Sequence, residues 1–89
     1  MSWKVDFSPR ALKFLYQNNM NEDVILEKVS LALKKFQGED VNIDIKKLKG
    51  REDIFRIRKG DIRIIYRLDK KIGIFILAVE RRKEDTYKL

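Results

Sequence analysis

Alternation of apolar and charged residues in the second half of the chain constrains the fold more than any other feature. Residues 54–58 read Ile-Phe-Arg-Ile-Arg, and residues 62–68 read Ile-Arg-Ile-Ile-Tyr-Arg-Leu. Because successive side chains of a strand point to opposite faces, each segment predicts a strand with one buried face and one charged face. The intervening residues 59–61, Lys-Gly-Asp, are typical of a hairpin turn. The pattern therefore predicts an antiparallel pair of strands.

The rest of the chain predicts two helices and two more strands. Residues 3–7 alternate Trp, Val and Phe with Lys and Asp, as a half-buried strand does. Ser8-Pro9 is typical of a helix start, and this helix is expected to end near Asn18. A second helix is expected from Asn21 to Gly38. Residues 72–79 are apolar on both faces, which predicts a central strand.

Helical spacing also predicts which helix residues are buried. In the first helix the expected core residues are Leu12, Leu15, and either Tyr16 or Ala11. In the second helix one apolar stripe is expected in the core: Ile25, Val29, Ala32, Leu33 and Phe36. A loop is expected after Gly38, anchored to the core by Val41, Ile43 or Leu48.

These elements predict one small α+β domain spanning residues 1–89. Its two N-terminal helices are expected to pack on a mostly antiparallel four-stranded sheet, in the order β-α-α-β-β-β. Residues 80–89 are polar, and we expect either a short C-terminal helix or an ordered tail there.

Missing residue types exclude several kinds of chemistry. The chain has no cysteine and no histidine, which excludes disulfides, thiolate nucleophiles, Cys/His zinc sites and Ser-His pairs. The acidic residues form no evident metal-binding motif, so no metal or cofactor is expected. The longest apolar run, residues 72–79, is far shorter than the ~20 residues of a membrane helix. With no signal-peptide pattern at the N-terminus, we expect a soluble, cytoplasmic protein without membrane contact.

Positive charge is concentrated in one part of the chain. The net charge is +7, and residues 46–67 contain nine basic and three acidic side chains. Such a local excess attracts phosphate polymers. A lysine-rich, solvated surface is the alternative interpretation.

Alternation predicts where part of this charge lies. If Phe55 and Ile57 face the helices, then Arg56, Arg58 and Arg63 point outward on the other face of the hairpin. Guanidinium groups pair well with phosphate oxygens. Tyr87 is the candidate general base, and a neighbouring arginine such as Arg81 would favour its phenolate. A ring packed on the core is the alternative interpretation of Tyr87.

Three sequence motifs resemble those of a known family. Residues 47–50 read Lys-Leu-Lys-Gly, and residues 55–66 read Phe-Arg-Ile-Arg-Lys-Gly-Asp-Ile-Arg-Ile-Ile-Tyr. Arg81 is followed six residues later by Tyr87. Together these motifs resemble the RelE toxins of the RelE/ParE superfamily, and the resemblance extends over the whole chain. The long motif is shared across the superfamily, whereas the Arg81–Tyr87 pair matches the C-terminal segment of the nucleases.

The resemblance implies the toxin of a type II toxin–antitoxin pair. Such a toxin is a ribosome-dependent endoribonuclease that cleaves mRNA in the A site by metal-independent attack of a ribose 2′-hydroxyl, which inhibits translation. By position, Tyr87 would be the general base, Arg63 would hold the scissile phosphate, and Arg81 would serve the leaving oxygen. Arg56 and Arg58 stand where family members often have lysine, and since arginine keeps its proton they would act by charge alone. Further RNA-binding candidates are Lys47, Lys49, Arg82 and Lys83.

The family also implies partners and leaves two other functions open. An acidic RelB-like antitoxin is the expected protein partner, and the ribosome, mRNA and, through the antitoxin complex, operator DNA are the other expected partners. The first alternative is a ParE-like inhibitor of DNA gyrase. The second is a non-catalytic nucleic-acid-binding co-repressor.

Overall fold

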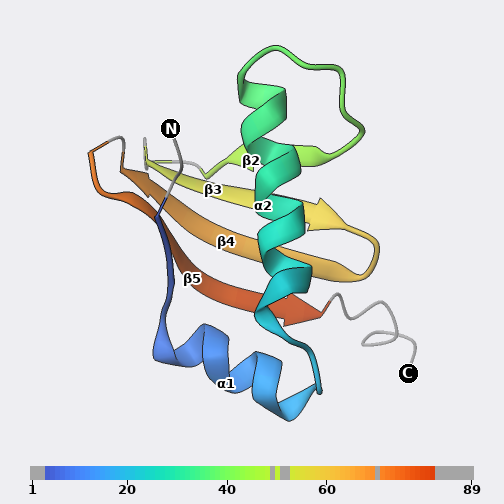
Figure 1. The fold of residues 1–89 in the computed structure, drawn as a ribbon, viewed down its shortest axis with the longest axis vertical. Helices are drawn as coiled ribbons and strands as arrows, with labels where there is room; N and C mark the ends of the chain where they lie inside the picture. Colours follow the sequence, from blue (N-terminus) through green and yellow to red (C-terminus); the bar gives the residue numbers. More distant parts are fainter. Residues whose placement is uncertain (1–3, 49, 51–52, 70, 82–89) are drawn as a thin grey trace.

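Two helices and five strands make up the computed structural model, which describes residues 4–48, 50, 53–69 and 71–81 (Figure 1). The elements in chain order are β1 (Val5–Phe7), α1 (Pro9–Gln17), α2 (Glu22–Phe36), β2 (Asp44–Lys47), β3 (Ile54–Lys59), β4 (Ile62–Asp69) and β5 (Gly73–Arg81). The predicted α+β class and the order of the helices are confirmed.

All five strands form one sheet in the order β1-β5-β4-β3-β2. The strands pair antiparallel except for β1, which runs parallel to β5 at one edge. The predicted hairpin is present, because β3 ends at Lys59 and β4 begins at Ile62. β5 lies between β1 and β4, as its two apolar faces predicted.

The sheet has one strand more than the four that we predicted. β2 lies in the segment expected to be a loop, and it pairs with β3 at the second edge of the sheet. Residues 41–46 alternate Val41, Ile43 and Ile45 with Asn, Asp and Lys, and Ile43 is buried. The hydrophobic pattern therefore agrees with a strand in this segment, and main-chain pairing with β3 forms it over Asp44–Lys47.

The helices occupy different places on the sheet. α2 crosses the face formed by β3, β4 and β5, whereas α1 lies beyond β5 at the sheet edge (Figure 1). The core lies between the helices and this face, with Ile25 and Val29 of α2 against Ile57 and Ile64 of the hairpin. Tyr66 is fully buried in the same cluster.

Ser8 ties the start of α1 to β5. Its hydroxyl accepts a hydrogen bond from the Ala11 amide (3.0 Å) and donates one to the Leu77 carbonyl (2.8 Å). Leu77 is the extra residue of a β-bulge, since Ile76 and Ala78 pair with consecutive residues of β4. The helix cap and the bulge thus position α1 along the edge of β5.

Some burial predictions for the helices were wrong. In α1 the buried residues are Ala11 and Leu15, whereas Leu12 is exposed and Tyr16 is 86% exposed. α1 packs at the sheet edge, so only a narrow stripe of it enters the core. At the end of α2, Phe36 is also exposed, and its ring meets Phe55 edge to face with 5.3 Å between centroids.

The last strand is shifted from its predicted position. Ile72 is exposed and precedes the strand, which begins at Gly73 and continues through Glu80 to Arg81. Gly73 has φ +132°, and a Cβ there would collide with the carbonyl of Lys4. Glycine is therefore required where β1 approaches β5. Glu80 belongs to the strand, and not to a C-terminal helix or tail as predicted.

Candidate functional site

The face of the sheet opposite α2 carries the predicted arginines. We call it the open face, because α2 covers the other side (Figure 1). Arg58 of β3 is paired directly with Arg63 of β4, and Arg56 is paired with Ile65 two residues away. Cross-strand partners share a face, so the structure brings the three predicted strand arginines together there.

A row of two guanidiniums between two carboxylates crosses four strands of the open face. In register, Asp44 of β2 is paired with Arg58, Arg58 with Arg63, and Arg63 with Glu80 of β5. Arg58 Nε lies 3.7 Å from Asp44 Oδ2, and Arg63 Nε donates to Glu80 Oε1 at 3.2 Å. We call these four residues the charged row.

The order of charges explains how two arginines can lie side by side. Like charges directly opposite each other destabilise a sheet. Each arginine of the central pair, however, has a carboxylate on its outer side. The carboxylates offset the repulsion, and an anion between Arg58 and Arg63 would offset it further.

Arg56 lies beside the charged row and has unused hydrogen-bonding capacity. Its terminal nitrogen lies 3.4 Å from both carboxylate oxygens of Asp44, and its side chain is only 15% exposed. The Nε atoms of Arg56 and Arg58 are buried and make no hydrogen bond within the described part of the chain. Partly desolvated donors of this kind favour an anionic ligand.

Arg81 is placed on the other face of the sheet. Its register partner is Ile62, whose side chain belongs to the core beneath the helices. Its guanidinium donates to Asp61 Oδ2 at 2.7 Å and to Asn18 Oδ1 at 3.4 Å. The structure therefore does not bring Arg81 together with Arg63.

Of the four predicted RNA-binding residues and Tyr87, the structure describes Lys47 alone, and Lys47 is not part of the charged row. Lys47 is the register partner of Phe55, and its Nζ lies 5.9 Å from that ring, on the face that α2 covers. Lys49, Arg82, Lys83 and Tyr87 lie outside the described residues.

Sequence reasoning missed three charged residues of the open face. Asp44 was placed in a loop and Glu80 in a tail, so neither received a strand face. Lys46, paired with Arg56, was missed for the same reason. Alternation would have identified Asp44 and Lys46 if β2 had been predicted as a strand. Glu80 would still have been assigned to the wrong face, because the bulge at Leu77 shifts the alternation along β5.

The far end of the open face differs from the charged row. Arg67 lies over the Phe75 ring at 6.0 Å, beside a small hollow of about 90 Å³ that Asp6 and Asp69 also line. Asp69 Oδ1 accepts hydrogen bonds from the amides of Lys71 and Ile72, which hold the pKa of Asp69 below its ordinary value. Mixed charge makes this end a weaker attractant for phosphate than the charged row.

Tyr66 is excluded as an accessible acid or base. Its side chain is fully buried and stacks on Phe55 with 5.6 Å between centroids. Its hydroxyl has no hydrogen-bond partner among the described residues, and burial raises its pKa far above the ordinary value. The phenol stays protonated inside the core.

The described residues contain neither a metal-binding cluster nor a membrane-spanning helix. Residues 4–48, 50, 53–69 and 71–81 contain no cluster of three acidic side chains that could hold a metal ion. No helix in that part of the chain is long and apolar enough to cross a membrane.

Solved structures of toxins share this fold. The archaeal RelE–RelB complex from Pyrococcus horikoshii matches with a TM-score of 0.65 and 27% identity, covering 94% of this chain and 99% of that chain. The RelB–RelE complex from Methanococcus jannaschii matches with a TM-score of 0.56 and 25% identity over 94% and 98%. The YoeB dimer from Staphylococcus aureus, 19% identical over 93% and 100% with a TM-score of 0.62, shows the same fold. No family model and no curated protein matches the sequence.

Proposed function

The shared fold and the solved RelE structures support membership of the RelE toxin family, and on this premise we propose that the chain is the toxin of a type II toxin–antitoxin pair. We further propose that it is a ribosome-dependent endoribonuclease that cleaves mRNA in the A site without a metal ion. The observation that carries this proposal is the central pair of the charged row, Arg58 and Arg63, with Arg56 beside it.

The proposed reaction needs anion stabilisation and one base. A ribose 2′-hydroxyl attacks the adjacent phosphorus, which expels the 5′-oxygen of the next nucleotide and leaves a 2′,3′-cyclic phosphate. Arg63 and Arg58 would hold the non-bridging oxygens, where negative charge develops. Arg56 would add positive charge from the side, since arginine is always protonated.

The C-terminal residues complete the proposed reaction. Tyr87 would accept the proton of the 2′-hydroxyl. Arg81 would stabilise the leaving oxygen, while water supplies its proton, since arginine is a poor acid. Because Arg81 contacts Asp61 on the opposite face, it would have to release that carboxylate and turn around the end of β5. RNA contacts by Lys47, Lys49, Arg82 and Lys83 are part of the same proposal.

An acidic antitoxin is the proposed protein partner. Two solved relatives are complexes of RelE with RelB. The net charge of +7 favours fast association with an acidic chain. Leu12 and Tyr16 of α1 are exposed and offer an apolar contact for such a partner.

Cleavage on programmed ribosomes tests the proposed function. Purified protein is expected to cut mRNA at codon-specific positions and to leave 2′,3′-cyclic phosphate ends. Tyr87→Phe is expected to lose most of this activity. Tyr16→Phe removes a hydroxyl from an exposed residue of α1 and is expected to keep the wild-type activity. Intact mRNA after incubation with folded wild-type protein would reject the nuclease proposal.

The position of Arg81 favours a second candidate, a ParE-like inhibitor of DNA gyrase. If Arg81 stays bound to Asp61, the charged row binds anions but lacks a group for the leaving oxygen. A supercoiling assay separates the two candidates. Gyrase inhibition that Tyr87→Phe leaves unchanged, together with intact mRNA, would support the gyrase inhibitor.

A further inference from the structure

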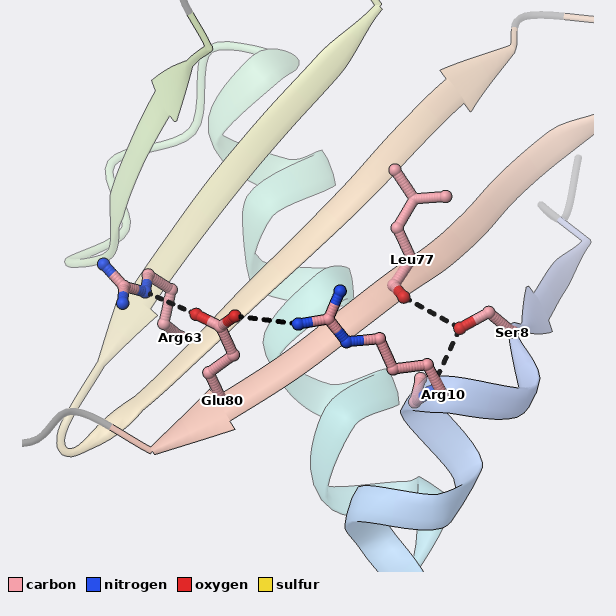
Figure 2. Close-up of polar contacts among 6 residues, drawn as sticks. Ser8, Arg10, Arg63, Leu77 and Glu80 are labelled. Carbon is pink, nitrogen blue, oxygen red and sulfur yellow. Dashed lines mark hydrogen bonds and ion pairs between the residues drawn. The ribbon is translucent and has the colours of Figure 1, made fainter.

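Glu80 joins two arginines from distant parts of the chain. Its Oε1 accepts from Arg63 Nε at 3.2 Å, and its Oε2 lies 3.5 Å from Arg10 Nη2 (Figure 2). Figure 2 views the open face with α2 behind the strands, and the Arg10 side chain reaches from α1 across β5 toward the carboxylate. One carboxylate therefore bridges an arginine of a strand and an arginine of a helix.

The contact with Glu80 determines which part of Arg63 is available. Nε is occupied by Glu80, while the hydrogen bonds and ion pairs of the described residues include none to the two terminal nitrogens of Arg63. Glu80 lies on the side of Arg63 away from Arg58, because β5 and β3 flank β4 on opposite sides. Held in this way, Arg63 keeps its terminal donors free for an anion at the central pair.

Arg10 is held near the charged row by the start of its helix. Ser8 caps α1 and bonds to the Leu77 carbonyl, three residues before Glu80 on β5. The Arg10 side chain is nonetheless 76% exposed, so its remaining donors face solvent. An exposed surface ion pair contributes little to stability, which leaves the Arg10–Glu80 contact without a strong folding role.

From this arrangement we infer that Glu80 is a positioning residue that orients Arg63 toward the scissile phosphate. We also infer that Arg10 is a further RNA-binding residue, which contacts a phosphate next to the scissile one. The inference rests on the proposed function, since it assigns roles in RNA binding and cleavage. With Arg10 included, the proposed RNA-binding surface extends from the hairpin across β5 to α1.

Two substitutions of Glu80 test the positioning role in the ribosome assay. Glu80→Ala removes both oxygens, and kcat is expected to fall by about tenfold to 100-fold, because small misplacements of a catalytic group cost this much. KM is not expected to rise, since a negative charge near RNA is lost. Glu80→Gln keeps an oxygen acceptor for Arg63 Nε and is expected to recover most of kcat.

The control is Glu27→Gln, an exposed glutamate on α2, on the other side of the sheet. It is expected to leave both kcat and KM unchanged. Equal loss in Glu80→Ala and Glu80→Gln, or a kcat for Glu80→Ala equal to wild type, would overturn the positioning role.

Arg10→Gln tests the RNA-binding role. KM is expected to rise several-fold with kcat unchanged, and the salt dependence of RNA binding is expected to fall by about one unit of slope. Lys34→Gln removes the same charge from an exposed position of α2 and is the matched control. An unchanged KM, or the same rise in both variants, would overturn this role for Arg10.

Side-chain NMR of the free protein separates this inference from the proposed function. The Nε–H signal of Arg63 is expected to be protected from solvent exchange in wild type, less protected in Glu80→Gln and unprotected in Glu80→Ala. Rapid exchange in wild type would overturn the positioning role even if the protein cleaves mRNA. A protected Arg63 Nε–H signal without any mRNA cleavage would support the orientation of Arg63 by Glu80 and reject the nuclease proposal.

Discussion

The two faces of the hairpin β3–β4 use the same strands for opposite purposes. On the face beneath α2, Ile57 and Ile64 are paired and fully buried. One residue along each strand, Arg58 and Arg63 are paired on the open face and reach solvent. Apolar burial on the first face stabilises the domain, while the second face carries a like-charge pair that costs stability.

This difference indicates which face of so small a domain can accommodate a binding site. The helix-covered face has little freedom to change, because close packing makes each methylene count. The open face tolerates an arginine pair only because Asp44 and Glu80 lie on either side of it. A costly, offset charge pattern of this kind is a better indication of a binding site than net charge.

The largest effect is expected from Ile64→Ala, which tests the packing of the face beneath α2. Ile64 is fully buried, so the free energy of unfolding is expected to fall by about 2–5 kcal/mol. Urea denaturation measures it. Its neighbour Ile65 points to the open face and is half-buried, so Ile65→Ala is expected to cost clearly less. Equal losses would show that the two faces do not differ in packing.

Arg63→Gln tests the proposed role of the open face. Cleavage on ribosomes is expected to fall about 100- to 1,000-fold, because one preorganised donor to the developing oxyanion is lost. The melting temperature is expected to stay constant or rise, since the repulsion with Arg58 is relieved. Arg67→Gln, on the same face of the same strand, is the control. Similar cleavage by Arg63→Gln and Arg67→Gln would mean that the charged row has no special role.

Tyr66→Phe is expected to stabilise the protein by about 1 kcal/mol. The variant removes a buried hydroxyl that lacks a hydrogen-bond partner among the described residues and keeps the ring that stacks on Phe55. Thermal and urea denaturation at neutral pH measure the difference. Tyr16→Phe, at an exposed phenol, serves as control and is expected to change nothing.

The same pair of variants makes a prediction about pH. Burial raises the pKa of Tyr66 in the folded state, so its neutral form is favoured there. The unfolded tyrosine loses its proton near its ordinary pKa of ~10. Stability is therefore expected to be constant in this respect below about pH 10 and to fall as pH rises further. Tyr66→Phe is expected to reduce that fall, and an identical alkaline decline in both proteins would contradict the assignment.

The smallest effect is expected from Asp44→Asn. Asp44 is half exposed and contacts Arg56 and Arg58 at 3.4–3.7 Å, so its loss is expected to cost less than about 1 kcal/mol. The cost is expected to disappear in 1 M salt, where the screening length is ~3 Å. Denaturation at low and high salt measures it. A large cost that persists in salt would show that Asp44 acts as a core residue.

The two parts of the charged row differed in how well the sequence predicted them. Arg58 and Arg63 were placed correctly, because strict alternation and a short turn determine both their face and their proximity. Asp44 was missed because residues 41–46, which do alternate, were assigned to a loop. Glu80 was missed because its strand was expected to end at residue 79, and the bulge at Leu77 shifts the alternation before it. Arg10 carries no local signal at all, since its contact with Glu80 spans most of the chain.

Arg81 shows the limit of motif reasoning most clearly. Its spacing to Tyr87 matches the C-terminal motif of the family, but the spacing says nothing about the face on which its side chain lies. That face follows from the pairing of Arg81 with Ile62. A bulge at Leu77 changes the alternation along β5, so counting residues from Ile74 to Arg81 would assign the wrong side.

By itself, the sequence determined the hairpin, the two helices and the charge of each face of the hairpin, because these depend on periodicities within short segments. The tertiary structure alone decided which charges became neighbours: Asp44 with Arg58, Glu80 with both Arg63 and Arg10, and Arg81 with Asp61. The physical reason is that neighbours across a sheet are set by strand order, register and bulges. Those depend on the packing of the whole chain, and no local pattern records them.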